Sequence, residues 1–181
     1  SLDLDGYVAA SGTITGSIDN PVFQGDVRSR KVVVNGSSFS NIEGSLYADK
    51  KAVNVLNLSL YDEDGGIYSF KGGVDMAQGN RLFGQANVED ANIENIIEIA
   101  TDKEIDNVVN GQLDGTIGLG GPADNPSLDV RGFVTDVAFG DQIVGTATID
   151  ASLSNKKWNI RKLALPIDTG TIAVGGTMDY N

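Results

Sequence analysis

Hydrophobic and polar residues alternate with a period of two along most of the chain. Near the C-terminal third, Ile143, Ala147 and Ile149 are separated by polar positions such as Thr146 and Thr148. The same alternation recurs in residues 13–19, 42–49, 69–76, 82–89 and 113–119. Successive side chains of a strand point to opposite faces, so each segment predicts a strand with one apolar and one polar face. This pattern is typical of an antiparallel sheet with one wet side.

Turn-forming residues separate these predicted strands at the spacing of hairpins. They are Asn35-Gly36, Asp64-Gly65-Gly66, Gln78-Gly79-Asn80 and Asn155-Lys156. Asn and Gly tolerate the positive φ angles that tight hairpin turns require. The sequence therefore predicts a mainly β protein, built as a long curved antiparallel or mixed sheet.

Glycine often occupies the predicted apolar face, between aliphatic residues. Gly44 lies between Ile42 and Leu46, and Gly72 lies between Phe70 and Val74. Glycine in a strand marks a bend, or a place where another group approaches the backbone closely. Both interpretations, strong curvature and a concave apolar trough with room for a ligand, are compatible.

The period changes between Asp90 and Asn110. One helix face would carry residues spaced i, i+3, i+4 and i+7, namely Ile93, Ile96, Ile97 and Ala100. Asp90 or Asn92 would cap its start. The pattern predicts a short helix near 92–101 that packs over the sheet as a lid or spacer. Its polar side is acidic, which does not suit a helix lying on a membrane surface.

A second short helical turn is expected over residues 101–109, where Thr101 and Glu104 form a possible capping box. The acidic residues Asp102, Glu104 and Asp106 are interpreted as a hydrated face or loop. Gly111 would end this region.

The chain contains two copies of one unit. Asn20-Pro21 recurs as Asn125-Pro126, and Leu58 recurs as Leu163. The alternation also slips by one residue after Val55 and again after Ile160, which predicts a β-bulge at the same place in both copies. Leu56 is expected on the same face as Leu58 and Leu60. The predicted organisation is a first β repeat at 1–91, a helical insertion at 92–110 and a second β repeat at 111–181.

The composition of the chain argues against several classes of function. The chain has 25 acidic and 13 basic residues, a net charge of −12, and neither Cys nor His. The negative charge argues against nucleic acid and against a basic patch on anionic lipid. The missing residue types exclude thiolate metal sites and cysteine nucleophiles and remove the commonest general base. We therefore expect no enzyme activity, no cofactor and no metal.

Three local features have alternative interpretations. Asp62, Glu63 and Asp64 precede two glycines but lack the spacing of a calcium loop, which favours a solvated hairpin turn. Residues 118–121, Gly-Leu-Gly-Gly, lack the Lys that follows in a phosphate-binding loop. Trp158 is expected in the core rather than at the mouth of the groove.

The order of motifs resembles the AsmA-like superfamily, in particular the C-terminal region of its TamB-type translocation and assembly module proteins. The resemblance rests on residues 12–18, a glycine-punctuated strand, followed by Asn20-Pro21, and on the corresponding 111–119 and Asn125-Pro126. Asp129-Val130 stands where the pattern usually has glycine. The resemblance covers nearly the whole chain.

The resemblance implies a long sheet folded into an open groove with an apolar interior, a β-taco. It also implies a periplasmic segment of a protein anchored in the inner membrane by an N-terminal helix outside this sequence. Such proteins pair with an Omp85-type outer-membrane barrel, TamA or BamA. They take part in phospholipid transport between the membranes and in assembly of outer-membrane proteins and autotransporters. We expect the present chain to be a piece of such a protein.

A continuous apolar trough would suit this role without catalytic residues. Each buried CH₂ contributes about 0.8 kcal/mol, so two chains of about sixteen carbons oppose transfer through water by on the order of 25 kcal/mol. One alternative is a scaffold that pairs with nascent strands through a sheet edge or the groove. A more distant alternative is a stalk segment of an adhesin or solenoid that has no ligand. The residues expected to line the groove are Ile14, Ile18, Ile42, Leu46, Leu58, Leu60, Phe70, Val74, Leu82, Val88, Leu113, Ile117, Ile143, Ile149, Leu153, Leu163, Leu165, Ile172 and Val174.

Overall fold

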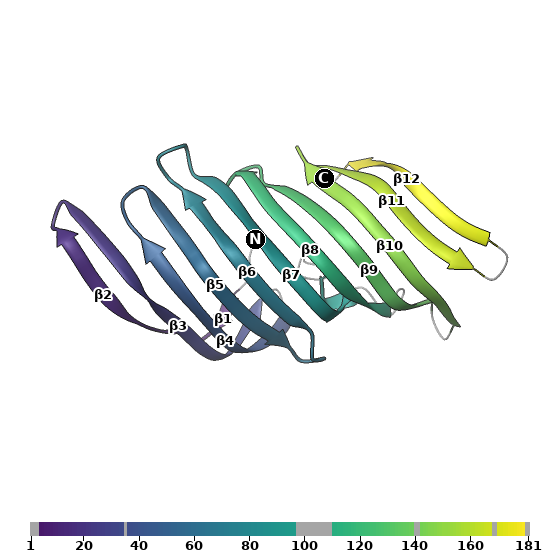
Figure 1. Cartoon of the computed structure of the whole chain (residues 1–181), viewed down its shortest axis with the longest axis horizontal. Helices are drawn as coiled ribbons and strands as arrows, with labels where there is room; N and C mark the ends of the chain where they lie inside the picture. The colour runs from purple at the N-terminus through teal and green to yellow at the C-terminus, as the bar shows by residue number, and fades with distance from the viewer. Residues whose placement is uncertain (1–3, 35, 97–109, 140–141, 168–169, 180–181) are drawn as a thin grey trace.

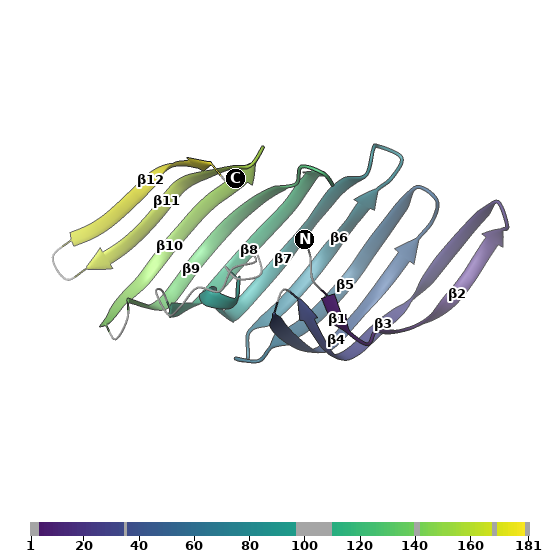
Figure 2. The same ribbon diagram turned by 180° about the vertical axis from the view of Figure 1, so that it is seen from behind.

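The chain forms one long antiparallel sheet, seen from its two faces in Figures 1 and 2. The computed structural model describes residues 4–34, 36–96, 110–139, 142–167 and 170–179. Its strands are β1 (Leu4–Gly6), β2 (Ala9–Ser17), β3 (Asn20–Val34), β4 (Ser37–Ala48), β5 (Ala52–Asp62), β6 (Ile67–Asp75), β7 (Arg81–Asn92), β8 (Asn110–Pro122), β9 (Ser127–Phe139), β10 (Gln142–Ser154), β11 (Lys157–Ile167) and β12 (Gly170–Asp179).

The topology is a meander that stays open. From β3 to β12 every strand pairs with the next one in the sequence, and every pair is antiparallel. At the N-terminal edge β2 and the short β1 both pair with β3, at different ends of that strand. The predicted mainly β, antiparallel fold is confirmed, and among the described strands the parallel pairing that a mixed sheet would need does not occur.

One face of the sheet is apolar across its whole width. Residues directly opposite one another share a face, so the register can be followed from strand to strand. One such row crosses eleven strands: Ala10, Val27, Gly44, Leu58, Phe70, Ala86, Ile117, Val130, Ala151, Ile160 and Gly176.

The neighbouring row is polar, and it lies one residue along each strand except in β11, where the bulge makes the step two residues. From β3 to β11 it consists of Arg28, Glu43, Ser59, Ser69, Asn87, Thr116, Arg131, Asp150 and Lys162. The two rows lie on opposite faces, which explains how a sheet of this size has one apolar and one hydrated side.

The predicted bulge is present in both halves of the chain. The register slips between Val55 and Leu58 in β5, and between Ile160 and Leu163 in β11. A bulge turns two consecutive residues to the same side. The prediction for Leu56 was wrong for this reason, because Leu56 belongs to the bulge and lies among polar residues of the other face.

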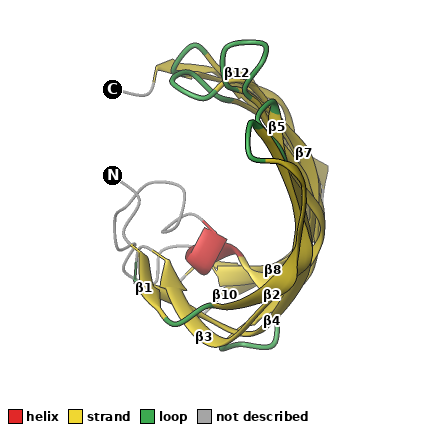
Figure 3. Ribbon diagram, turned by 90° about the vertical axis from the view of Figure 1, so that its left-hand side faces the viewer, coloured by secondary structure: helices red, strands yellow, loops and turns green. Residues whose placement is uncertain are grey.

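Three further bulges contain an Asn or Asp with positive φ. Asn41 in β4, Asp90 in β7 and Asp136 in β9 have φ values of 50°, 51° and 51°, and each lies where the register slips. Bulges increase the local twist and bend the strand that carries them. Seen along its length, the sheet is strongly arched (Figure 3), and these bulges supply a local cause of the bend.

A helical turn at 93–96 lies on the concave side of this arch (Figure 3). Asn92 caps it, because its Oδ1 accepts a hydrogen bond of 2.9 Å from the backbone N–H of Glu94. Asp90 is instead part of the β7 bulge. The remainder of the helix expected at 92–101, with Ile97 and Ala100, lies outside the described residues, as do Asp102, Glu104 and Asp106.

The most deeply buried cluster lies beneath this turn. Leu113, Val134, Val137 and Ala147 are at most 5% exposed, and Ile93, Ile96, Ile149 and Leu165 pack against them. The contacts of Ile93 and Ile96 agree with the predicted covering role of the helix. Trp158, expected in the core, is only half-buried and lies outside this cluster, opposite Leu153 and Met178.

Candidate binding site in an apolar hollow

The concave face contains an apolar hollow of about 550 Å³. Its walls come from β3 to β8, with Ile96 of the helical turn and Val8 completing them. Phe39, Tyr68 and Phe70 supply three rings, and Phe39 meets Tyr68 edge to face with their centroids 5.5 Å apart. Apart from the hydroxyl of Tyr68, every side chain in this lining is a hydrocarbon. The hollow therefore offers contact area to an apolar ligand and almost no hydrogen-bonding partner.

Five residues predicted to line a groove do line this hollow. They are Ile42, Leu58, Leu60, Phe70 and Ile117. The register places a second group on the same face but away from the hollow: Ile14, Leu46, Val74, Leu82, Val88, Leu113, Ile149, Leu153, Leu163, Leu165, Ile172 and Val174.

Members of this second group differ in accessibility. Val88 and Leu113 are 1% and 3% exposed, so they are core residues rather than open surface. Ile172 and Val174, on the edge strand β12, are about half exposed. Ile18 does not belong to the face, because it lies in the turn after β2 and is fully exposed. The side chain of Ile143 lies outside the described residues.

Sequence reasoning missed several residues of the hollow. Val27 and Val32 both line it although they are five positions apart, which strict alternation forbids. Arg30 and Lys31 between them are both exposed, so the alternation slips inside β3. Two consecutive charged residues between valines are the sequence signal of this slip.

Aromatic rings fill part of the space that glycines leave on the apolar face. Gly12 faces Gly25, and Gly72 faces Gly84 in the register. A Cβ atom added to Gly25 would lie 2.7 Å from Cζ of Phe23, and one added to Gly72 would lie 2.7 Å from Cζ of Phe70. Each ring thus rests on a glycine pair, so these glycines provide room for a neighbouring ring as well as bending the sheet.

The predicted hairpin turn follows β5, with Glu63 and Asp64 exposed, but Asp62 is buried rather than solvated. This residue is 5% exposed and ends β5 beside the hollow. Its Oδ1 accepts hydrogen bonds from the backbone N–H groups of Asp64 at 3.0 Å and Gly66 at 2.7 Å. Its Oδ2 accepts a hydrogen bond of 3.0 Å from the hydroxyl of Tyr68. The carboxylate thereby satisfies three donors at the end of the β5–β6 hairpin.

The Tyr68 hydroxyl is held in its neutral form. Burial is the main cause that raises its pKa above the ordinary value, and the negative charge of Asp62 adds to the effect. Among the described residues that line the hollow, the one polar side-chain group is therefore uncharged and already bonded to Asp62.

The same turn is linked to the helical turn. The side-chain amides of Asn92 and Asn95 donate hydrogen bonds to Oδ2 of Asp64, at 3.3 Å and 3.1 Å. Glu63 forms an exposed ion pair of 3.0 Å with Lys31 of β3. The hydrogen bonds of Asn92 and Asn95 with Asp64 position the helical turn, and with it Ile96, at the wall of the hollow.

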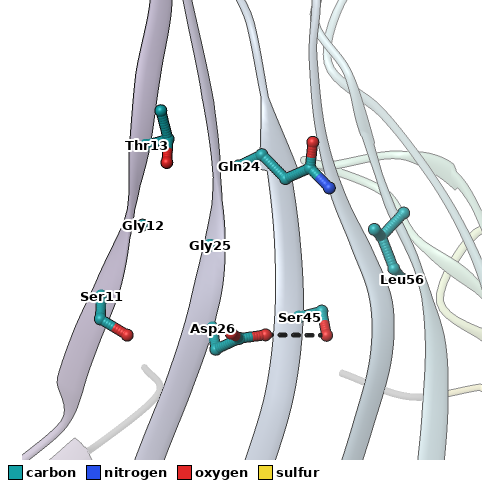
Figure 4. Close-up of a pocket in the computed structure, with 8 residues that line it drawn as sticks. All are labelled: Ser11, Gly12, Thr13, Gln24, Gly25, Asp26, Ser45 and Leu56. Carbon is teal, nitrogen blue, oxygen red and sulfur yellow. Dashed lines mark hydrogen bonds between the residues drawn. The ribbon is translucent and has the colours of Figure 1, made fainter.

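The convex face carries a second, polar hollow of about 520 Å³ over β2 to β5 (Figure 4). Ser11, Thr13, Gln24 and Asp26 surround Gly12 and Gly25, and the Ser45 hydroxyl donates a hydrogen bond of 3.2 Å to Asp26. It is formed by side chains of the hydrated face of the sheet.

An ion-pair cluster occupies the convex face near the second bulge. Arg161, a bulge residue of β11, pairs with Asp129 at 2.9 Å and with Asp150. Arg131 approaches the same two carboxylates at 3.1 Å and 3.8 Å. The hydrogen bond from Arg161 lowers the pKa of Asp150 below its ordinary value. The cluster is exposed and joins β9, β10 and β11.

The other candidate sites carry no chemistry of their own. Residues 118–121 lie in β8 rather than in a loop, so they do not form a phosphate-binding turn. Within the described ranges, no group of three or more Asp or Glu side chains is placed to hold a metal ion. The described part of the chain also lacks a helix with the length and hydropathy to cross a membrane.

The fold and the hollow define a class, an open antiparallel sheet with an apolar concave face and a helical turn packed on it. Comparison with known proteins does not take the identification further: no family model, no curated protein and no solved structure matches the chain.

Proposed function

We propose that this chain shields the acyl chains of lipids on its concave face and is a groove segment of a TamB-like protein. In this role it would sit in the periplasm, carry phospholipid between the inner and outer membranes, and need no catalytic residue or cofactor. The observation that carries the proposal is the apolar row from Ala10 to Gly176, which crosses eleven strands without a polar residue.

The physical argument is a transfer free energy. Transfer of an acyl chain of about sixteen carbons from a membrane into water costs about 0.8 kcal/mol of free energy for each CH₂ group. A continuous apolar surface that remains beside the chain along its path removes most of that cost. The hollow between Val27 and Ile117 is a place where such a chain would be held.

A matched pair of substitutions in β8 tests the proposal. Ile117→Arg places a charge in the hollow, whereas Thr116→Arg places the same charge on the exposed opposite face. The purified 181-residue chain and both variants are mixed with phosphatidylethanolamine vesicles, re-isolated, and analysed for bound lipid by native mass spectrometry. We expect lipid on the wild-type chain and on Thr116→Arg, and at least a tenfold loss on Ile117→Arg. Circular dichroism verifies that each variant folds.

Equal lipid on both arginine variants, or no lipid on the wild-type chain, would contradict the proposal. A further variant on another strand, Leu58→Arg with Ser59→Arg as its control, guards against a folding defect particular to β8.

A second candidate function is a scaffold for outer-membrane barrel or autotransporter assembly, in cooperation with an Omp85-type barrel. One observation favours it: the outer edge of β12 has no partner among the described strands, and residues 170–178 contain no charged residue. Natural edge strands usually carry charges or prolines that prevent pairing. Site-specific photo-crosslinking from Thr171 or Thr177 to an added barrel-strand peptide would support this function, and its absence would count against it.

A further inference from the structure

Phe70 belongs to the apolar row and lines the hollow. It lies on β6, directly opposite Leu58 of β5 and Ala86 of β7. Its ring rests on Gly72 and Gly84, because a Cβ added to Gly84 would lie 2.9 Å from both Cε2 and Cζ of Phe70. The ring therefore uses the space of two missing side chains and lies low against the sheet. A Cβ at either glycine would collide with this ring as well as with backbone atoms of the sheet.

The volume of the hollow sets how much apolar chain it holds. A water molecule in the liquid has a share of about 30 Å³, and a methylene group is of similar size. A hollow of about 550 Å³ therefore holds roughly eighteen such units. That corresponds to about one acyl chain of common length.

From this geometry we infer that Phe70, whose ring rests on Gly72 and Gly84, sets the depth of the hollow and thereby fits it to a single unbranched acyl chain. The inference rests on the proposed function and adds a residue that determines which apolar chains are accepted. Protein interiors are close-packed, so a methyl branch requires volume that a fitted hollow does not have. Removing the ring supplies that volume.

The chain contains its own control for this inference. Phe23 rests on Gly12 and Gly25 in the same way, with Cβ positions 2.8 Å and 2.7 Å from its ring atoms. Phe23 lies outside the lining of the hollow. Phe70→Ala and Phe23→Ala therefore remove the same ring from the same kind of glycine pair, and only Phe70→Ala enlarges the hollow.

The test measures a preference between two ligands. Palmitic acid and the methyl-branched phytanic acid, which have the same sixteen-carbon backbone, compete with a fluorescent fatty acid for the 181-residue chain. We expect the wild-type chain and Phe23→Ala to prefer palmitic acid. In Phe70→Ala this preference should fall by about tenfold, the size expected when a pocket gains or loses one or two methyl positions.

The outcomes separate the two proposals. If the wild-type chain binds neither acid, the proposed function fails and this inference fails with it. If palmitic acid binds but Phe70→Ala keeps the wild-type preference, or Phe23→Ala loses it equally, only the role of Phe70 is overturned. Phe70→Leu, a smaller change, replaces Phe70→Ala if circular dichroism shows that the alanine variant does not fold, and should reduce the preference in the same direction.

Discussion

Tyr68 donates its hydroxyl hydrogen bond to Oδ2 of Asp62 across 3.0 Å, six residues back along the chain. The ring of Tyr68 lines the apolar hollow, and the carboxylate of Asp62 organises the β5–β6 turn. One contact therefore joins the candidate binding surface to the turn that also holds the helical turn through Asp64.

Replacing Asp62 should be among the more damaging single changes in this hairpin. In Asp62→Ala the backbone donors of Asp64 and Gly66 and the Tyr68 hydroxyl lose their acceptor. We expect a loss of about 2 to 4 kcal/mol in the free energy of unfolding, measured by urea denaturation. Asp62→Asn keeps Oδ1 and should lose about 1 kcal/mol. Glu63→Gln, which removes an exposed ion pair with Lys31, is the control and should leave the urea midpoint almost unchanged. A harmless Asp62→Ala would contradict this account.

The raised pKa of Tyr68 predicts a loss of stability in alkali. An unfolded tyrosine ionises near pH 10, whereas the buried Tyr68 stays neutral well above that. The stabilisation is complete below about pH 10 and is lost as the pH rises further. Melting temperatures between pH 8 and 12 should therefore fall less steeply in Tyr68→Phe than in the wild-type chain. Tyr61→Phe controls for removal of a phenol at an exposed position, and equal slopes in Tyr68→Phe and the wild type would exclude this origin.

Acid should weaken the convex ion-pair cluster. The hydrogen bond from Arg161 depresses the pKa of Asp150, so its contribution is present above the unfolded pKa of about 3.9 and disappears as the pH falls through the lower folded value. The urea midpoint of Arg161→Gln should lie below that of the wild type at pH 6, and the two should converge near pH 2. Arg28→Gln, whose pair with Glu43 is 3.9 Å long and exposed, should show little difference at either pH. A gap that persists at pH 2 would mean that Arg161 acts through packing.

The bulge at Asn41 predicts an unusual ranking of substitutions. Its φ of 50° costs an ordinary residue about 1 to 2 kcal/mol, whereas glycine adopts this angle without strain. Asn41→Gly should therefore leave the free energy of unfolding within about 0.5 kcal/mol of the wild type, and Asn41→Val should lower it by about 1 to 2 kcal/mol. Glu43→Val, on the same strand and also exposed, is the control. If valine is tolerated equally at both positions, the left-handed angle does not matter.

Much of the fold follows from local pattern. Alternation in segments such as 82–89 predicts strands because a strand has a side-chain period of two, and turn residues such as Asn155-Lys156 mark their ends. The sequence predicted the bulges after Val55 and after Ile160, because the leucines that follow continue the alternation in the opposite phase. A slip inside β3, between Val27 and Val32, was missed because it leaves no break in the strand.

The binding surface is less accessible to this reasoning. Which apolar residues are core and which are open depends on what covers them: Val88 and Leu113 are buried, while Ile172 on β12 is half exposed. All three share the same alternation. The sequence also did not predict the burial of Asp62, since its partners Gly66 and Tyr68 reach it only through the geometry of the hairpin.

Residue order alone was enough to predict a mainly β protein whose sheet has one apolar and one hydrated side, because each strand shows its two faces independently of every other strand. The sequence did not show where on the apolar face a hollow remains. That outcome depended on which bulges bend the sheet, on the placement of Ile96 over β8 to β10, and on Phe70 settling onto Gly72 and Gly84. These are contacts between strands and layers, and their distances arise only when the whole sheet is assembled.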